Sequence, residues 1–255
     1  MKIYGLQKLT LLDYPGKVAC TVFLGGCDFC CPFCHNSELI GNDSCKGSDF
    51  SDFAGTVPGI NENKLSRTIP PEAISAADFF SFLKKRRGLL DGVAVTGGEP
   101  TLHHDLPEFL TQIHELGFSI KLDTNGNHPD LLSTLLEMGL VDYVAMDIKN
   151  APSRYSETIG KPGFDLSNVR RSASLLMNGT VDYEFRTTVV AEFHDDAVFP
   201  EIGQWICGAK RYFLQCFVDR DTVLRTGLHA PREEDLRHYA ALMQPYVREV
   251  ALRGV

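Results

Sequence analysis

The sequence has no excess of positive charge. Its 25 lysine and arginine residues face 33 aspartate and glutamate residues, which gives a formal net charge of −8 at pH 7 and an isoelectric point near 5.5. No basic patch interleaved with aromatic residues occurs. Proteins that bind nucleic acid usually carry such a patch, so we expect no nucleic-acid partner.

Long apolar segments are also missing. No uninterrupted apolar stretch reaches the roughly 18 to 20 residues that a membrane-spanning helix needs. The first residues do not have the pattern of a secretory signal, and no internal repeat is evident. We therefore expect a cytoplasmic protein that has no membrane partner.

The composition is that of one globular domain. Hydrophobic residues make up 44% and charged residues 23% of the 255 residues, a length that suits a single α/β barrel. A chain of this size buries its own core without covalent cross-links, and a reducing cytosol disfavours disulfides. We predict one domain over residues 1–255 and consider a disulfide the weaker interpretation of its cysteines.

Four of the eight cysteines fall within residues 27–34. Cys27, Cys31 and Cys34 have the spacing C-x3-C-x2-C. Soft thiolate ligands select zinc, copper(I) or an iron-sulfur cluster. Three ligands to a cubane cluster leave one iron without a protein ligand, whereas a structural metal centre is usually closed by a fourth side chain. The number of ligands therefore favours a catalytic centre.

At this loop the sequence resembles the radical S-adenosylmethionine superfamily, whose signature has this spacing with an aromatic residue, here Phe33, before the last cysteine. Residues 31–36 (Cys-Pro-Phe-Cys-His-Asn) are most similar to glycyl-radical-enzyme activases. Residues 5–8 and 12–17 (Leu-Asp-Tyr-Pro-Gly-Lys) resemble the activating proteins of anaerobic ribonucleoside-triphosphate reductase. The resemblance implies a [4Fe-4S] cluster on Cys27, Cys31 and Cys34, its open iron chelated by S-adenosylmethionine.

Cys30 departs from that family pattern. With it, the loop also contains two C-x2-C pairs, and four thiolates could close a zinc site. Cys27, Cys31 and Cys34 with His35 could form a Cys3His site instead. Adjacent Cys30 and Cys31 are poorly placed to face one metal, which favours the cluster. A zinc-stabilised binding module without catalysis is the alternative.

Apolar runs bounded by turn residues predict strands that alternate with helical segments. The predicted strands cover residues 18–24, 92–96, 118–122, 141–146, 183–190 and 211–218, with a final edge strand at 246–252. The predicted helices cover residues 75–87, 106–116, 129–138, 166–177, 199–206 and 231–244. This alternation predicts an α/β fold with a parallel sheet wound as a partial (β/α)6 barrel. Residues 37–68, rich in Ser, Asp, Gly and Asn, predict an irregular surface excursion.

The motif Gly97-Gly98-Glu99-Pro100 follows the second predicted strand. Two glycines after a strand are often only a tight turn. In the superfamily that the chain resembles, this motif binds the methionine amine of S-adenosylmethionine. Glycines let backbone approach a ligand, and Glu99 offers an acceptor to an ammonium group.

The next two predicted strands end at Leu-Asp-Thr-Asn-Gly and Met-Asp-Ile-Lys. Such residues are ordinarily solvated loop ends or helix caps, but both stretches match glycyl-radical-enzyme activases. The resemblance implies that Asp123, Thr124 and Asp147 help to hold a monovalent cation beside the cofactor carboxylate, for which hard oxygen ligands are suited. It also implies that Lys149 contacts the cofactor.

Arg186 lies inside an apolar predicted strand. If it points inward it needs an anionic partner, because an unpaired buried charge is costly. The cofactor carboxylate or an active-site acid would serve, and an outward salt bridge to a helix is the alternative. Gln215 is a weaker candidate for a cofactor contact.

Other residues are interpreted as structural. We expect His194 in a solvated loop, and we expect Cys20, Cys207 and Cys216 to be small buried hydrophobes.

The cysteine loop, the Gly97 to Pro100 motif and the residues at 123, 124, 147 and 149 all follow the carboxyl ends of successive predicted strands, the rim where sites assemble in barrels. The resemblance implies an oxidoreductase in which a reduced cluster cleaves S-adenosylmethionine, and the resulting radical takes a hydrogen atom from a glycine of a partner. The implied partners are anaerobic ribonucleoside-triphosphate reductase and a low-potential electron donor such as flavodoxin or ferredoxin. An activase of pyruvate formate-lyase and a radical enzyme acting on a small molecule are the alternatives.

Overall fold

The computed structural model describes residues 1–41, 45 and 73–255. Most of the predicted excursion at residues 37–68 lies outside the described residues. Its first part forms the short 3₁₀ helix η1 (Ser37–Leu39).

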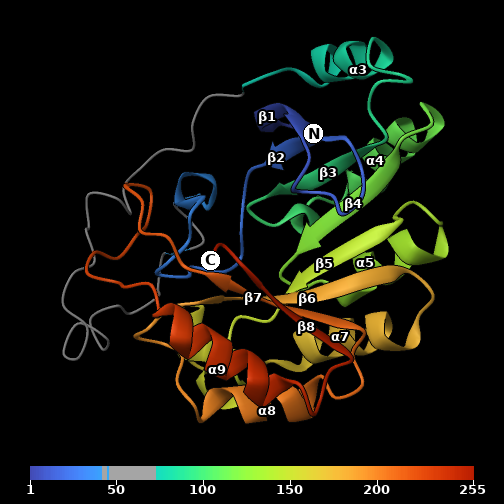
Figure 1. Ribbon diagram of the computed structural model, residues 1–255. Coiled ribbons are helices and arrows are strands. Elements are labelled where there is room, and N and C mark those ends of the chain that lie inside the picture. Colours follow the sequence, from blue (N-terminus) through green and yellow to red (C-terminus); the bar gives the residue numbers. More distant parts are fainter. Residues whose placement is uncertain (42–44, 46–72) are drawn as a thin grey trace.

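Eight strands form one sheet in which neighbours in sequence are neighbours in space. They are β1 (Ile3–Thr10), β2 (Ala19–Leu24), β3 (Gly92–Gly97), β4 (Ser119–Thr124), β5 (Tyr143–Asp147), β6 (Asp182–Val189), β7 (Arg211–Cys216) and β8 (Glu249–Arg253). Strands β2 to β8 are parallel, and β1 pairs with β2 antiparallel. Among the described residues β1 and β8 do not pair with each other, so the curved sheet stays open (Figure 1).

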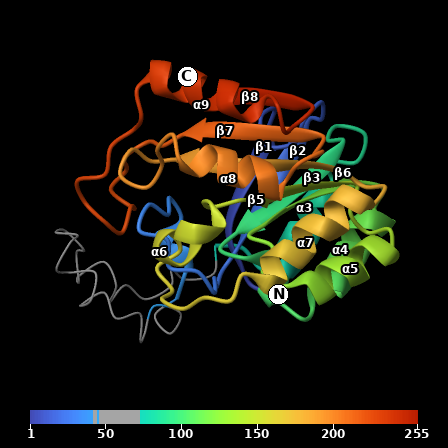
Figure 2. The ribbon, with the colours of Figure 1, turned by 90° about the horizontal axis from the view of Figure 1, so that it is seen from below.

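Helices connect the parallel strands and lie along the outer face of the sheet (Figure 2). The α-helices are α3 (Ala76–Lys84), α4 (Leu106–Glu115), α5 (Pro129–Glu137), α6 (Tyr155–Thr158), α7 (Ser167–Asn178), α8 (Val198–Trp205) and α9 (Glu233–Met243). The 3₁₀ helices η2 (Pro100–Leu102) and η3 (Pro152–Arg154) follow β3 and β5. The predicted partial (β/α)6 barrel is confirmed, with β1 and β8 as additional strands.

Local sequence explains where these elements begin. Helix α3 starts at Ser75, whose side-chain oxygen accepts a hydrogen bond from the backbone N–H of Asp78 at 3.1 Å, as a capping residue does. Phe79 and Leu83 of this helix lie one turn apart, and both are fully buried in the core. The buried strands β2 and β3 are short apolar runs, as parallel strands covered on both faces usually are.

The two faces of the sheet have different neighbours. On β5, Val144 and Met146 belong to the main core beneath the helices, whereas Tyr143 and Ala145 face the barrel interior with Ala19. This alternation is the period of two that a strand imposes. The interior carries the polar chemistry.

Tyr14 closes the amino-terminal end of the barrel. Its ring is 3% exposed and lies 6.1 Å from the ring of Tyr143, measured between centroids. The neighbouring Asp13 accepts a hydrogen bond from Thr21 Oγ1 at 2.5 Å. The motif at residues 12–17 therefore lies at the opposite end of the barrel from the cysteine loop, and Tyr14 is its buried residue.

A buried ion pair attaches the last strand to the interior. Glu184 on β6 is fully buried and accepts hydrogen bonds from both terminal nitrogens of Arg253 at 2.6 and 2.8 Å. The hydroxyl of Tyr143 donates a third, at 2.6 Å. A buried carboxylate is tolerated when its acceptor positions are filled in this way.

The expectation that three cysteines are buried hydrophobes holds for Cys20 only. Cys207 is exposed and Cys216 is partly exposed. Both lie at the ends of their elements, where apolar neighbours in sequence do not guarantee burial.

Candidate active site

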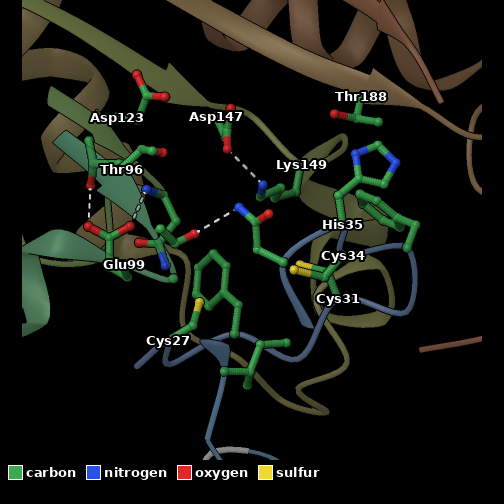
Figure 3. A pocket seen from close by; sticks show the side chains of 18 of the residues that line it. Cys27, Cys31, Cys34, His35, Thr96, Glu99, Asp123, Asp147, Lys149 and Thr188 are labelled. Carbon is green, nitrogen blue, oxygen red and sulfur yellow. Dashed lines mark hydrogen bonds and ion pairs between the residues drawn. The ribbon is translucent and has the colours of Figure 1, made fainter. Parts of the chain in front are cut away.

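A cavity of about 220 Å³ opens at the carboxyl ends of the parallel strands. Figure 3 shows that side chains from the cysteine loop and from several strand ends point into it. The predicted residues that line it are Cys27, Cys31, Phe33, Cys34, Gly97, Gly98, Glu99, Asp123, Thr124, Asp147, Lys149, Arg186 and Gln215. Pro100 is buried at the start of η2 and does not line the cavity.

The cysteine loop is fixed by backbone hydrogen bonds on both sides. Gly26 N and Cys27 N donate to the carbonyls of Leu39 and Ile40 at 2.6 and 3.2 Å. Cys34 N donates to Cys31 O at 3.1 Å, which folds the end of the loop into a turn. The loop thereby keeps three cysteines at one cavity.

The thiols of Cys27, Cys31 and Cys34 are free. Burial raises the pKa of Cys31 to about 12, although the positive charge of Lys149 opposes this. Burial also raises the pKa values of Cys27 and Cys34. Thiolate forms are therefore unfavourable here unless a positive group compensates their charge, and a metal centre does so.

Cys30 does not belong to this set. It is fully buried, packs with Ile40 and Leu224, and forms a disulfide with Cys45 across a Cα–Cα distance of 5.7 Å. The preference against a disulfide holds for Cys27, Cys31 and Cys34 but was wrong for Cys30, because a pairing that depends on tertiary proximity cannot be inferred from compartment and chain length. The donor set at the cavity is three free thiols, which fits a cluster that keeps one iron open.

Within the residues that the structure describes, no three His, Cys, Asp or Glu side chains converge closely enough to hold a single metal ion. His35 instead stacks on Phe217 with 5.6 Å between ring centroids, and its Nε2 lies 2.7 Å from Val218 O.

Gly97 and Gly98 bring the end of β3 against the cysteine loop. Gly97 has φ +132°, and a Cβ there would lie 2.1 Å from Leu24 O. A Cβ on Gly98 would lie 1.9 Å from Gly26 O. From the sequence we expected the glycines to admit a ligand; the structure shows that they admit neighbouring backbone. Any larger residue would push the two segments apart.

Glu99 connects the ends of β3 and β4. Its carboxylate is 1% exposed and accepts from Thr124 Oγ1 at 2.7 Å and from Asn125 N at 2.6 Å. Thr101 donates through its backbone N–H at 3.0 Å and through its hydroxyl. Burial raises the pKa of Glu99 to about 6, against these hydrogen bonds. Its predicted contact with an ammonium group would be added to an already occupied carboxylate.

Arg186, on β6, points inward and binds one aspartate on β5 and one on β4. Its Nε donates to Asp147 Oδ1 at 3.0 Å and its Nη1 to Asp123 Oδ2 at 3.3 Å. Lys149 Nζ donates to Asp147 Oδ2 at 2.8 Å, and Lys121 Nζ donates to Asp123 Oδ1. Of the alternatives left open by the sequence, pairing with an active-site acid is the one observed.

This cluster pairs three cationic side chains with two carboxylates. Glu99, a third carboxylate, lines the same cavity, so the charges there are close to balanced. Burial opposes ionisation of Asp147, yet Arg186 and Lys149 lower its pKa to about 2. The arrangement suits an anionic group of a ligand, such as a carboxylate.

His194 was expected in solvent and is buried instead, with 2% exposure. Its Nε2 lies 3.0 Å from Lys149 O, and Val190 N donates to its Nδ1 at 3.1 Å. Burial lowers the pKa of His194 to about 4, so the ring is neutral and donates from Nε2. The flanking acidic residues made this stretch resemble a surface loop.

Asn36 was not predicted to be a site residue. Its Nδ2 donates to Gly97 O at 3.2 Å and joins the end of the cysteine loop to β3. Asp28 and Asn125, considered below, make a similar junction on the other side. Short polar residues beside a motif carry no pattern of their own, and only the tertiary contacts identify them.

Comparison with known proteins places the chain in a family. Residues 21–192 match the model of the radical SAM superfamily, and the chain belongs to that superfamily. Membership implies a [4Fe-4S] cluster and S-adenosylmethionine as cofactors.

The curated relatives are of one kind. The chain is 28% identical over 259 residues to a putative glycyl-radical enzyme activating enzyme of Methanocaldococcus jannaschii, covering 99% of this chain and 96% of the relative. It is 27% identical over 154 residues to the pyruvate formate-lyase-activating enzyme of Listeria monocytogenes, covering 58% of this chain and 53% of that enzyme. These homologues indicate an enzyme of the activating class within the superfamily.

Solved structures share the fold. SuiB of Streptococcus suis bound to S-adenosylmethionine superposes with a TM-score of 0.62 at 14% identity, covering 92% of this chain and 52% of that one. A domain of a pyruvate-formate lyase-activating enzyme from Bacteroides vulgatus gives a TM-score of 0.52 at 15% identity, with 64% and 99% covered. No helix in the described part of the chain is long and apolar enough to cross a membrane.

Proposed function

We propose that this protein activates a glycyl radical enzyme, and that its partner is anaerobic ribonucleoside-triphosphate reductase. In this proposal Cys27, Cys31 and Cys34 hold a [4Fe-4S] cluster, and S-adenosylmethionine occupies the cavity beside it. The observation that carries the proposal is the lining of that cavity, where three free thiols meet the Gly-Gly-Glu motif and the ion pairs of Lys149 and Arg186. When bound, the cluster and S-adenosylmethionine supply a radical that removes a hydrogen atom from a glycine of the partner.

The protein's own side chains orient the cofactor. The cavity is lined by Phe33 and by Gly97, Gly98 and Glu99 of the motif. Pro100 is the buried first residue of η2 and does not line it. Lys149 and Arg186 offer charge-assisted hydrogen bonds to a carboxylate, each worth about 1.5 to 3 kcal/mol. No general base is required, because the hard chemistry belongs to the cofactors.

A monovalent cation at Asp123, Thr124 and Asp147 would have competitors. Both aspartates already pair with Arg186, and Thr124 donates its hydroxyl to Glu99. Cation binding there therefore requires Arg186 to leave the aspartates, and we propose that it does so only when a ligand carboxylate is present to receive it.

The choice of reductase depends on the resemblance at residues 5–8 and 12–17. Tyr14 in that stretch fills the amino-terminal end of the barrel, so the motif supports the choice through sequence similarity alone and not through a contact at the cavity. The open edge between β1 and β8 is compatible with entry of a partner segment. A low-potential donor such as flavodoxin or ferredoxin would supply the electron.

Anaerobic reconstitution followed by mixing with candidate partners tests the proposal. We expect a glycyl radical signal in the electron paramagnetic resonance spectrum with the reductase. A signal with pyruvate formate-lyase and none with the reductase would reject this partner while retaining the class. Colourless, iron-free, zinc-loaded protein from anaerobic purification would reject the class.

A further inference from the structure

Asp28, the residue after Cys27, joins the cysteine loop to the connection that follows β4. Asp28 accepts hydrogen bonds from Asn125 Nδ2 at 2.7 Å and from Asn127 Nδ2 at 2.5 Å. His128 Nε2 lies 3.2 Å from Asp28 Oδ2, within ion-pair distance. All three partners belong to the short connection between β4 and α5. One carboxylate therefore fixes the beginning of the cysteine loop to a different strand end.

Asn125 makes this junction rigid. It is 5% exposed, and its backbone N–H donates to Glu99 Oε2 at 2.6 Å while its side chain donates to Asp28. Its Oδ1 also accepts from Asn127 N at 2.9 Å. Two carboxylates thus hold Asn125 from two directions, and the ends of β2, β3 and β4 meet at one residue.

Asp28 is also a charge beside Cys27. Its carboxylate is held by the side-chain amides of Asn125 and Asn127 and lies within ion-pair distance of His128, so it is a fixed charge one residue away from the proposed ligand Cys27. A fixed negative charge close to a metal centre disfavours the more negative, reduced state of that centre.

We propose that Asp28 is a positioning residue that fixes Cys27 and that its charge lowers the reduction potential of the cluster bound there. The inference rests on the proposed function, because it assumes the cluster on Cys27. A low potential favours electron transfer from the reduced cluster to the cofactor. Asp28 would then influence the reaction without touching the reacting atoms.

The test is Asp28→Asn in the full-length, anaerobically reconstituted protein. This variant removes the charge at nearly constant size. Iron content and the midpoint potential are measured together, the potential by a redox titration followed by electron paramagnetic resonance. We expect iron content close to wild type and a midpoint potential shifted in the positive direction. Activity is not needed for either measurement.

Asp91→Asn is the matched control. Asp91 Oδ2 also accepts a hydrogen bond, from Val18 N at 2.8 Å, but at the opposite end of the barrel. Its loss should leave the potential unchanged. Asp28→Glu separates the two parts of the proposal, since it keeps the charge and displaces the carboxylate. We expect less iron in this variant and a wild-type potential in the loaded fraction.

If Asp28→Asn does not fold, His128→Gln provides the test. Asp28, whose Oδ2 lies 3.2 Å from His128 Nε2, raises the pKa of His128, so at about pH 6 the ring is protonated. Removing this positive charge should shift the potential in the negative direction.

An unshifted potential in Asp28→Asn overturns the proposal, and so does iron loss with no shift in the remaining cluster. Wild-type iron content in Asp28→Glu overturns the positioning role. Wild-type protein that shows no iron-sulfur signal would instead overturn the proposed function.

Discussion

The two ends of the barrel differ in whether their buried polar groups are already paired within the protein. At the amino-terminal end Tyr14 closes the interior, and Glu184 has its acceptor positions filled by Arg253 and Tyr143. At the carboxyl end three thiols are free, and Lys149 and Arg186 line a cavity together with the carboxylates that they bind. The closed end contributes stability, and the open end retains binding capacity. Substitutions at the closed end should therefore change the free energy of unfolding, and substitutions at the open end should change iron content or cofactor affinity.

The largest effect is expected from Cys31→Ser. Loss of one of three proposed ligands should abolish the cluster, because its remaining two thiols cannot hold it at the loop. Iron content and the visible absorption of the anaerobic protein measure this. Cys30→Ser is the control and should keep the iron, since Cys30 faces Ile40 and Leu224 and not the cavity. The reverse pattern would show that the ligand assignment is wrong.

Tyr14→Ala should damage stability and leave the cofactor site intact. Removing a large aromatic side chain that is 3% exposed creates a cavity and should cost about 3 to 5 kcal/mol of unfolding free energy. Urea unfolding measures the loss, and iron content of the folded fraction should match wild type. Tyr14→Phe keeps the ring and should lose far less. Iron loss in proportion to the stability change would mean that the two ends are coupled.

His194 makes stability depend on pH. Burial lowers its pKa to about 4 in the fold, from about 6.5 in an unfolded chain. The neutral ring is favoured in the fold, so its contribution is complete above pH 6.5 and is lost as the pH falls toward 4. Linkage limits this loss to about 3 kcal/mol.

His194→Gln should therefore give a flatter curve of unfolding free energy against pH between these values. Urea unfolding at a series of pH values would show it. Glu99, whose pKa is raised to about 6, acts in the opposite sense in part of this range, but it is present in both proteins and cancels in the difference. Equal slopes for the two proteins would contradict a buried neutral His194.

The smallest effect is expected from Arg186→Lys. The charge is kept, but a lysine cannot bind Asp123 and Asp147 as a planar guanidinium does. Loss of one charge-assisted hydrogen bond should weaken binding of S-adenosylmethionine about tenfold. Equilibrium dialysis measures the affinity. Arg211→Lys at the amino-terminal end, where Arg211 Nη2 contacts Asp182 at 3.1 Å, should not change it.

Much of this architecture could be predicted from the sequence because parallel strands leave a simple signal. Each buried strand is a short apolar run, and most candidate site residues lie at or just after the end of one, whereas Arg186 and Gln215 lie inside strands. Strand β1 was not predicted because three of its residues are partly exposed and three are exposed, which leaves no apolar run or regular alternation. Position after a strand end located Asp123, Asp147 and Lys149.

The parts that could not be predicted depend on contacts between distant segments. The disulfide of Cys30 requires a partner 15 residues away, and nothing in composition selects Cys45. His194 is buried by packing against the connection after β5, although its sequence neighbours are acidic. That Gly98 makes room for the backbone of Gly26, and not for a ligand, follows only from the folded contact between them.

The Cys30–Cys45 bond has a consequence for handling the protein. It closes a covalent ring that contains both Cys31 and Cys34, while Cys27 stays outside. By lowering the entropy of the unfolded chain, a ring of this size should raise the free energy of unfolding by about 3 kcal/mol. Thiol reductants used to load iron would cut the ring, so preparations made with and without them would differ in chain topology as well as in metal content.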